Sequence, residues 1–143
     1  MVEIDRSALV QYSAQQMFEL VNDIEKYPLF MAGCVDAKVI SRQERELIGE
    51  LCLAKAGIRQ RLVTRNTMRP PERIDMGLVE GNFKHFSATW KFESLGSEAC
   101  KISLSMRFEF GSGLLNVGAN KLFSGSANSL VDAVLKRARE VYE

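Results

Sequence analysis

The sequence predicts an α+β domain in which a curved antiparallel sheet of about six or seven strands wraps around a long C-terminal helix, with short helices after the first strand. Apolar residues recur at every second position between Val35 and Gly111, which is the pattern of strands that are wet on one face. Residues 114–142 contain no proline and carry a helical apolar stripe. Because the apolar face of the sheet needs a cover, we expect this last helix to provide it.

The bulk composition is that of a globular chain without a strong preference for a charged partner. The 143 residues suit one domain, 1–143, and 19 basic against 18 acidic side chains give a net charge of +1. A protein that binds nucleic acid through phosphates alone normally has a larger positive excess, so we expect no DNA partner. No apolar stretch approaches the ~20 residues of a membrane span, so we expect any membrane contact to be peripheral.

The cysteines indicate a reducing compartment. Their number is odd and their spacing is wide, with no CxxC pair for zinc and no disulfide framework. The first six residues contain no apolar run, so no signal peptide is expected. We therefore expect a cytoplasmic protein with reduced thiols at Cys34, Cys52 and Cys100.

The N-terminal segment predicts a strand followed by a capped helix. Residues 2–12 carry β-forming residues and alternating charge. Ser13 then stands three residues before Gln16, which is the spacing of a capping box at a helix N-terminus. Pro28 ends this helix or begins a short second one. The apolar residues at helical spacing are Met17, Phe18, Leu20, Val21 and Ile24.

Turn-forming residues divide the middle of the chain into strands. They are Gly57, Pro70, Pro71, Gly81 and Gly96. Alternation places a set of apolar side chains on the inner face of the predicted sheet, and charged or hydroxyl side chains on the outer face. The inner set is Leu47, Leu51, Leu53, Ile58, Leu62, Met68, Ile74, Met76, Leu78, Phe86, Ala88, Trp90, Phe92, Ile102, Leu104, Met106, Phe108 and Phe110.

The C-terminal stripe predicts one long helix. A continuous helix over this segment would be roughly 43 Å long, which exceeds one strand and favours a diagonal crossing of the sheet. Gly118 and Gly125 are the positions where we expect it to kink. The stripe consists of Leu115, Leu122, Phe123, Ala127, Leu130, Val134, Ala138 and Val141.

Aromatic and methionine side chains on the inner face predict an apolar cavity. A strongly curved sheet closed by one helix often leaves a gap, and these side chains would make it apolar and adaptable. The alternative is that they form an ordinary core. We expect Tyr27, Pro28 and Phe30 to lie at the entrance, because the proline interrupts a helix there. The candidate ligand-binding residues are Phe30, Met31, Met76, Phe86, Trp90, Met106, Phe108, Leu122 and Phe123.

The chain contains no recognisable catalytic constellation, so we expect neither an enzyme nor a metal site. Its one histidine, His85, alternates with Phe86 and is therefore expected on the surface. A row of arginines, Arg59, Arg61 and Arg65, shares one outward face. Two interpretations stay open for this row: cross-strand pairing with glutamates such as Glu46 and Glu50, or a contact surface for RNA or an acidic partner.

Several strings resemble the coenzyme Q-binding branch of the START-like superfamily, which is also called polyketide or oligoketide cyclase-like. The longest is VQYSAQQMFELVNDIEKYPLFMAGC at 10–34. The others are KAGI at 55–58, TRN at 64–66, LVEGNFKHF at 78–86, WKFESL at 90–95, EACKI at 98–102, FEF at 108–110 and LVDAVLKRAREVY at 130–142. They span nearly the whole chain in one order, and the likeness is greatest to the bacterial RatA-type branch, named as ribosome association toxins.

This resemblance implies a helix-grip fold with a hydrophobic cavity between the sheet and the last helix. It implies a binding protein for ubiquinone or a similar lipid, with no required cofactor, in the bacterial cytoplasm or peripherally at the inner membrane. The alternative is a toxin that binds the large ribosomal subunit and prevents its joining to the small one, and a cyclase-type enzyme is least favoured. At the cavity mouth the chain has Met31-Ala32-Gly33 where relatives often carry Leu-Pro-Trp or Leu-Pro-Gly.

Overall fold

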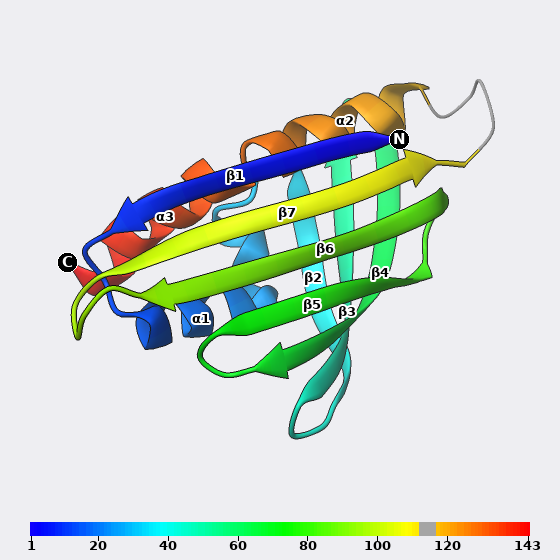
Figure 1. Cartoon of the computed structure of the whole chain (residues 1–143). Coiled ribbons are helices and arrows are strands. Elements are labelled where there is room, and N and C mark those ends of the chain that lie inside the picture. Colours follow the sequence, from blue (N-terminus) through cyan, green and yellow to red (C-terminus); the bar gives the residue numbers. More distant parts are fainter. Residues whose placement is uncertain (112–116) are drawn as a thin grey trace.

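Seven antiparallel strands form one sheet in the computed structural model, which describes residues 1–111 and 117–143. The strand order is β1-β7-β6-β5-β4-β3-β2, so hairpins join β2 through β7 in sequence and β1 pairs with β7 (Figure 1). The strands are β1 Val2–Val10, β2 Cys34–Arg42, β3 Glu46–Lys55, β4 Ile58–Arg69, β5 Arg73–Glu80, β6 Phe83–Ser94 and β7 Cys100–Phe110. The α+β class and the antiparallel sheet predicted from the sequence are confirmed.

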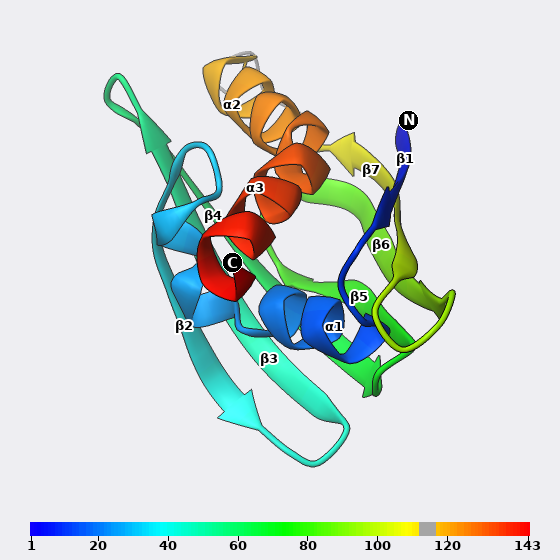
Figure 2. The same ribbon diagram turned by 90° about the vertical axis from the view of Figure 1, so that its left-hand side faces the viewer.

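The helices lie inside the curve of the sheet. Figure 2 shows β2, β3 and β4 on one side and β1, β7 and β6 on the other, with α2 and α3 in the opening between them. The helices are α1 Ala14–Asn22, the 3₁₀ helix η1 Ile24–Leu29, α2 Val117–Asn128 and α3 Leu130–Tyr142. None of the helices in the described part of the chain is long and apolar enough to cross a membrane.

The start of α1 follows the predicted capping box. The Ser13 hydroxyl accepts a 3.1 Å hydrogen bond from the backbone N–H of Gln16, and the Gln16 side-chain oxygen accepts one of 2.9 Å from the backbone N–H of Ser13. This reciprocal pair satisfies two amide donors that a helix N-terminus leaves free. Phe18 then packs edge-to-face on Phe92 of β6, with ring centroids 5.8 Å apart. Pro28 lies inside η1, so it belongs to a short second helix.

The expected kink positions in the C-terminal helix were wrong. The helix is interrupted at Ser129, between α2 and α3, and neither Gly118 nor Gly125 interrupts it. The Ser129 hydroxyl donates hydrogen bonds to the carbonyl oxygens of Gly125 (3.1 Å) and Ser126 (3.4 Å). A serine hydroxyl that bonds back to the preceding turn bends a helix, because it competes with the backbone ladder for those carbonyls.

Within the described residues, the predicted apolar stripe of this helix is buried or partly buried except at its C-terminal end. Phe123, Ala127, Val134 and Ala138 are buried, whereas Val141 is 48% exposed. Tyr142 takes the inward position in the last turn, where its hydroxyl donates a 2.7 Å hydrogen bond to the Gln16 carbonyl oxygen. Leu115, the first residue of the predicted stripe, lies outside the described residues.

The alternation of the strands is confirmed most clearly in β4 and β7. In β7 the side chains of Ile102, Leu104, Met106 and Phe108 are at most 5% exposed. In β4 the inward Leu62 and Met68 are buried, while Arg59, Arg61 and Arg65 are exposed on the opposite face. Polar and charged side chains therefore cover the convex side of the sheet, and the core lies between its concave side and the helices.

Candidate functional site

Aromatic rings fill the space where the last strands meet α2. The Phe123 ring of α2 lies 4.9 Å from that of Phe108 and 5.0 Å from that of Phe83, centroid to centroid, and both contacts are edge-to-face. Phe86 and Phe110 complete the cluster, at 6.1 and 6.0 Å from Phe123. Phe108 and Phe123 are only 0% and 2% exposed. This part of the interior is a packed core, because edge-to-face rings at such distances leave no room for a ligand.

A small polar cavity lies deeper inside, between η1 and the centre of the sheet. Its volume is about 20 Å³, which holds about one water molecule. Thr64 and Asn66 of β4 face it, and the Thr64 hydroxyl donates a 2.8 Å hydrogen bond to Oδ1 of Asn66. Across the cavity, the buried Oδ1 of Asn22 has no hydrogen-bond partner among the described residues.

These three polar residues were not predicted from the sequence. Thr64 and Asn66 occupy inward positions of β4, on the same face as Leu62 and Met68. A polar residue at an inward position of an otherwise apolar strand face was the available signal, because buried polar groups need a partner.

A larger apolar groove opens at the surface beside α2. It has a volume of about 360 Å³ and lies between α2, the β3–β4 hairpin and the segment before β2. The Ser126 hydroxyl donates a 2.6 Å hydrogen bond to the Ala32 carbonyl oxygen and so fastens α2 to that segment. Gly33 adopts a φ of +78°, where a side chain would be strained and would press on Leu122. The groove is lined by Ala32, Gly33, Lys55, Ala56, Ile58, Gly118, Lys121, Leu122, Gly125 and Ser126.

The candidate ligand-binding residues fall in different places. Leu122 lines the surface groove, whereas Met76 and Trp90 line the small polar cavity. Phe86, Phe108 and Phe123 belong to the aromatic cluster. Met31 and Met106 are buried in the core, and Phe30 is half-buried against the ring of Tyr27 at 5.1 Å. The structure therefore does not bring these residues together around one pocket.

The expected placement of Tyr27 at an entrance was wrong. Its side chain is 5% exposed, and its hydroxyl donates a 2.6 Å hydrogen bond to the Val21 carbonyl oxygen. Burial raises the pKa of the Tyr27 hydroxyl far above its usual value. The tyrosine thus anchors η1 to the end of α1, because its hydroxyl satisfies a carbonyl of the last helical turn.

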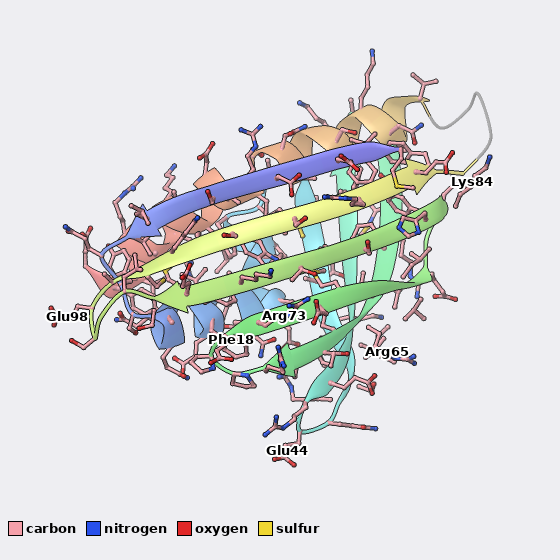
Figure 3. The ribbon with its side chains drawn as sticks, viewed as in Figure 1. Phe18, Glu44, Arg65, Arg73, Lys84 and Glu98 are labelled. Atoms are coloured by element: carbon pink, nitrogen blue, oxygen red, sulfur yellow. The ribbon has the colours of Figure 1, made fainter. Side chains whose placement is uncertain are left out.

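The arginine row on β4 is paired with glutamates, as one of the two interpretations predicted. Arg61 forms ion pairs with Glu50 and with Glu80, the latter at 2.6 Å, and Arg65 Nε lies 3.0 Å from Glu46. The hydrogen bond from Arg61 holds the pKa of Glu50 below its usual value. The third arginine, Arg59, places Nη2 3.4 Å from the sulfur of Cys52. Figure 3 shows Arg65 on the outer side of the sheet. Carboxylates therefore neutralise most of this row.

A cluster of metal ligands is absent from the described part of the chain. His85 is exposed, as predicted. Residues 1–111 and 117–143 contain no group of three or more His, Cys, Asp or Glu side chains placed to hold a metal ion. The site geometry thus consists of a packed interior, a surface groove and a charged outer face.

Comparisons of this chain with known proteins agree on one family. The profile of the family described as "Polyketide cyclase / dehydrase and lipid transport" matches residues 10–135. A Vibrio cholerae protein named "Ribosome association toxin RatA" is 39% identical over 142 residues, which cover 99% of each chain. A Xenopus laevis protein named "Coenzyme Q-binding protein COQ10 homolog B, mitochondrial" is 26% identical, and the match covers 99% of this chain and 59% of that protein.

A solved structure supports the fold. The Zhui aromatase/cyclase from Streptomyces sp. R1128 superposes with a TM-score of 0.81, covering 99% of this chain and 96% of that one at 18% identity. At this identity the likeness concerns the arrangement of the sheet and helices, because one fold carries many unrelated functions.

Proposed function

The chain belongs to the polyketide cyclase/dehydrase and lipid transport family, and from this premise we propose that it is a non-catalytic binding protein that acts on the large ribosomal subunit. One observation carries the proposal: 39% identity along 99% of both chains to a protein named ribosome association toxin. The partner is the subunit that the resemblance implied, and the action is to hinder its joining to the small subunit. The protein would act in the bacterial cytoplasm.

The packing of the interior favours a surface function over an internal lipid cavity. Ligand-binding cavities usually measure 300–1,000 Å³, whereas the polar cavity beside Trp90 measures about 20 Å³. The aromatic cluster around Phe123 occupies the region where the sequence predicted a cavity. We therefore place ribosome binding before lipid binding, which reverses the order that the sequence alone favoured.

The test is a pelleting assay with purified subunits. The protein is mixed with large subunits or with small subunits at 50 mM salt and centrifuged through a sucrose cushion. We expect it to pellet with the large subunit and to stay in the supernatant with the small one. Equal pelleting with both subunits, or with neither, would contradict the proposal.

The surface groove supports lipid binding as a second candidate. Its volume of about 360 Å³ suits part of an isoprenoid or acyl chain, and Lys55 and Lys121 among its lining residues suit a polar or anionic end group. The relative named coenzyme Q-binding protein is 26% identical over 99% of this chain. Native mass spectrometry of protein purified without detergent tests this, and we expect a lipid-sized mass increase that organic extraction removes. Mass equal to that of the bare chain, before and after incubation with ubiquinone, would contradict it.

A further inference from the structure

Three positive side chains lie side by side on the outer face, in a place that the sequence did not single out. In the sheet register Arg69 of β4 is opposite Arg73 of β5, and Arg73 is opposite Lys91 of β6. The neighbours Ile74 and Trp90 are 2% exposed and point inward, so alternation directs Arg73 and Lys91 outward. We call Arg69, Arg73 and Lys91 the basic row.

The row continues into hydroxyl side chains. Lys91 is opposite Ser103 of β7, and Ser103 is opposite Ser7 of β1. Five neighbouring strands thus contribute three cations and then two hydroxyls along one line across the sheet.

In the described part of the chain, Arg73 is the one member of the basic row with an ion-pair partner within 4 Å. Like charges directly opposite one another in a sheet are destabilising. Asp75 accepts two hydrogen bonds from Arg73, of 2.9 and 3.0 Å, and both start at Nε. The pKa of Asp75 is lowered, first by this Arg73 hydrogen bond and least by the nearby charge of Arg69. Among the described residues neither Arg69 nor Lys91 has an ion-pair partner within 4 Å, so both cations stay unpaired although Glu72 and Glu93 also border the row.

The surface is hollowed along the row. One hollow, of about 530 Å³, is lined by all three residues of the basic row, together with Glu72 and Glu93. A second hollow, of about 400 Å³, is lined by Ser7 and shares Lys91 and Ser103 with the first. The two therefore adjoin, and an extended molecule could follow the line from β4 to β1.

The start of α1 adds to the positive potential. Ala14, its first residue, lines the larger hollow, and α1 has no acidic residue in its first turn. The N-terminal end of a helix carries a partial positive charge, which favours anions near it.

We propose that the basic row is a contact surface for the phosphate backbone of RNA, an inference that rests on the proposed ribosome-directed function. Adjacent strands are about 4.8 Å apart, so the three cations form a line of roughly 10 Å, which suits a polymer with regularly repeated negative charges. Serine hydroxyls are among the groups that donate hydrogen bonds to phosphate oxygens. Arg61 and Arg65, for which RNA contact was one of two open interpretations, already face Glu50, Glu80 and Glu46.

The test uses two variants that remove the same charge in different places. Arg69→Gln/Lys91→Gln weakens the row and keeps Arg73, the partner of Asp75. Arg139→Gln/Lys84→Gln is the matched control, because it also removes one exposed arginine, on α3, and one exposed lysine. Figure 3 shows Lys84 at the far end of β6 from the region of Arg73.

The probe is a fluorescently labelled RNA hairpin, and its anisotropy is measured between 50 and 200 mM salt. Each lost phosphate contact lowers the slope of log K against log salt by about 0.9. For Arg69→Gln/Lys91→Gln, the slope of log K against log salt should therefore be shallower by about 1.8. This variant should also bind the hairpin at least roughly 10-fold more weakly at 50 mM salt. The control should stay within about twofold of the wild type. An equal loss of hairpin affinity in both variants would mean that only the net charge of the protein matters. That result would overturn the proposal that the basic row binds RNA.

Pelleting of the same proteins with large subunits separates this inference from the proposed function. If the protein binds the hairpin through the row but does not pellet with either subunit, the ribosomal function fails and the RNA surface stands. If subunits pellet but the wild type does not bind the hairpin, the RNA assignment is overturned, and a protein of the subunit becomes the partner.

Discussion

The hydroxyl of Thr64 donates a hydrogen bond to Oδ1 of Asn66 on the buried face of β4, where the two side chains are 5% and 4% exposed. Residues two apart in a strand share a face, so both point into the small polar cavity. The bond satisfies a polar group that would otherwise be unpaired in the core.

This bond predicts a loss of stability in Thr64→Val. The change leaves Oδ1 of Asn66 unpaired, which costs about 1–3 kcal/mol in the free energy of unfolding. Thr67→Val is the control, because Thr67 lies on the same strand and is exposed, so a change within about 0.5 kcal/mol is expected. Urea denaturation measures both, and equal midpoints for the two variants would show that the bond does not contribute.

The aromatic cluster predicts a severe effect at Phe108. Phe108→Ala should lower the free energy of unfolding by about 3–5 kcal/mol, because it opens a cavity in packed rings, and Phe108→Asp should prevent folding. Phe110→Ala should cost less, because Phe110 is only half-buried. Denaturation midpoints test the order, and a Phe108→Ala midpoint near wild type would mean that the cluster is loose.

The ion pairs of the outer face predict a stability that falls in acid. The pKa of Glu50 is lowered in the folded protein, first by the hydrogen bond from Arg61. The stabilisation from such a group is present above its unfolded-state pKa and is lost as the pH falls through its folded-state pKa. Glu50→Gln should therefore flatten the fall in stability between about pH 5 and pH 3. Glu44→Gln, in an exposed turn, should leave the profile unchanged, and identical profiles for both variants would contradict the prediction.

The cysteines should differ in reactivity. Burial raises the pKa of the Cys34 thiol to about 11 and also raises the pKa of Cys100, so few thiolates form at either residue near neutral pH. Cys52 is half-buried on the outer side of β3. Iodoacetamide at pH 8 should modify one thiol per folded chain, and Cys52→Ser should abolish that reaction. Modification of Cys34 at the rate of Cys52 would mean that the segment before β2 opens readily.

The groove predicts a variant that separates lipid binding from ribosome binding. A Cβ added at Gly125 would meet nothing within 4 Å, so Gly125→Leu should fill the groove without strain and gain up to ~1 kcal/mol of helix stability. We expect it to carry no lipid and to pellet with large subunits as the wild type does. Ser124→Leu, on the same helix but not among the groove-lining residues, is the control. Loss of pelleting in Gly125→Leu alone would link the two activities.

Local patterns predicted the elements of the fold well. The capping box of Ser13 and Gln16 depends on residues three apart, and the inward series from Ile102 to Phe108 depends on alternation within one strand. Such patterns depend only on residues within one segment of the chain, so they can be interpreted without knowing how the segments pack. The interruption at Ser129 was not predictable, because any serine can bond back to the preceding turn and the surrounding packing decides which one does.

The site was harder to predict because it depends on distances between segments. Phe108 and Phe123 belong to different elements, β7 and α2, and only the structure shows that their rings meet and fill the space expected to be open. The basic row was not predicted for the same reason. Arg69, Arg73 and Lys91 align through the register of two hairpins, which alternation within one strand cannot reveal.

The central claim, that this protein acts on the ribosome by binding and not by catalysis, is tested most directly by light scattering during subunit joining. Large and small subunits are mixed with increasing amounts of the protein, and the amplitude of the joining signal is recorded. We expect the signal to fall in proportion to added protein, to be abolished near one protein per large subunit, and to return when the protein is removed by a high-salt wash. Lasting inhibition by a small fraction of one equivalent, or no inhibition at any ratio, would contradict the account.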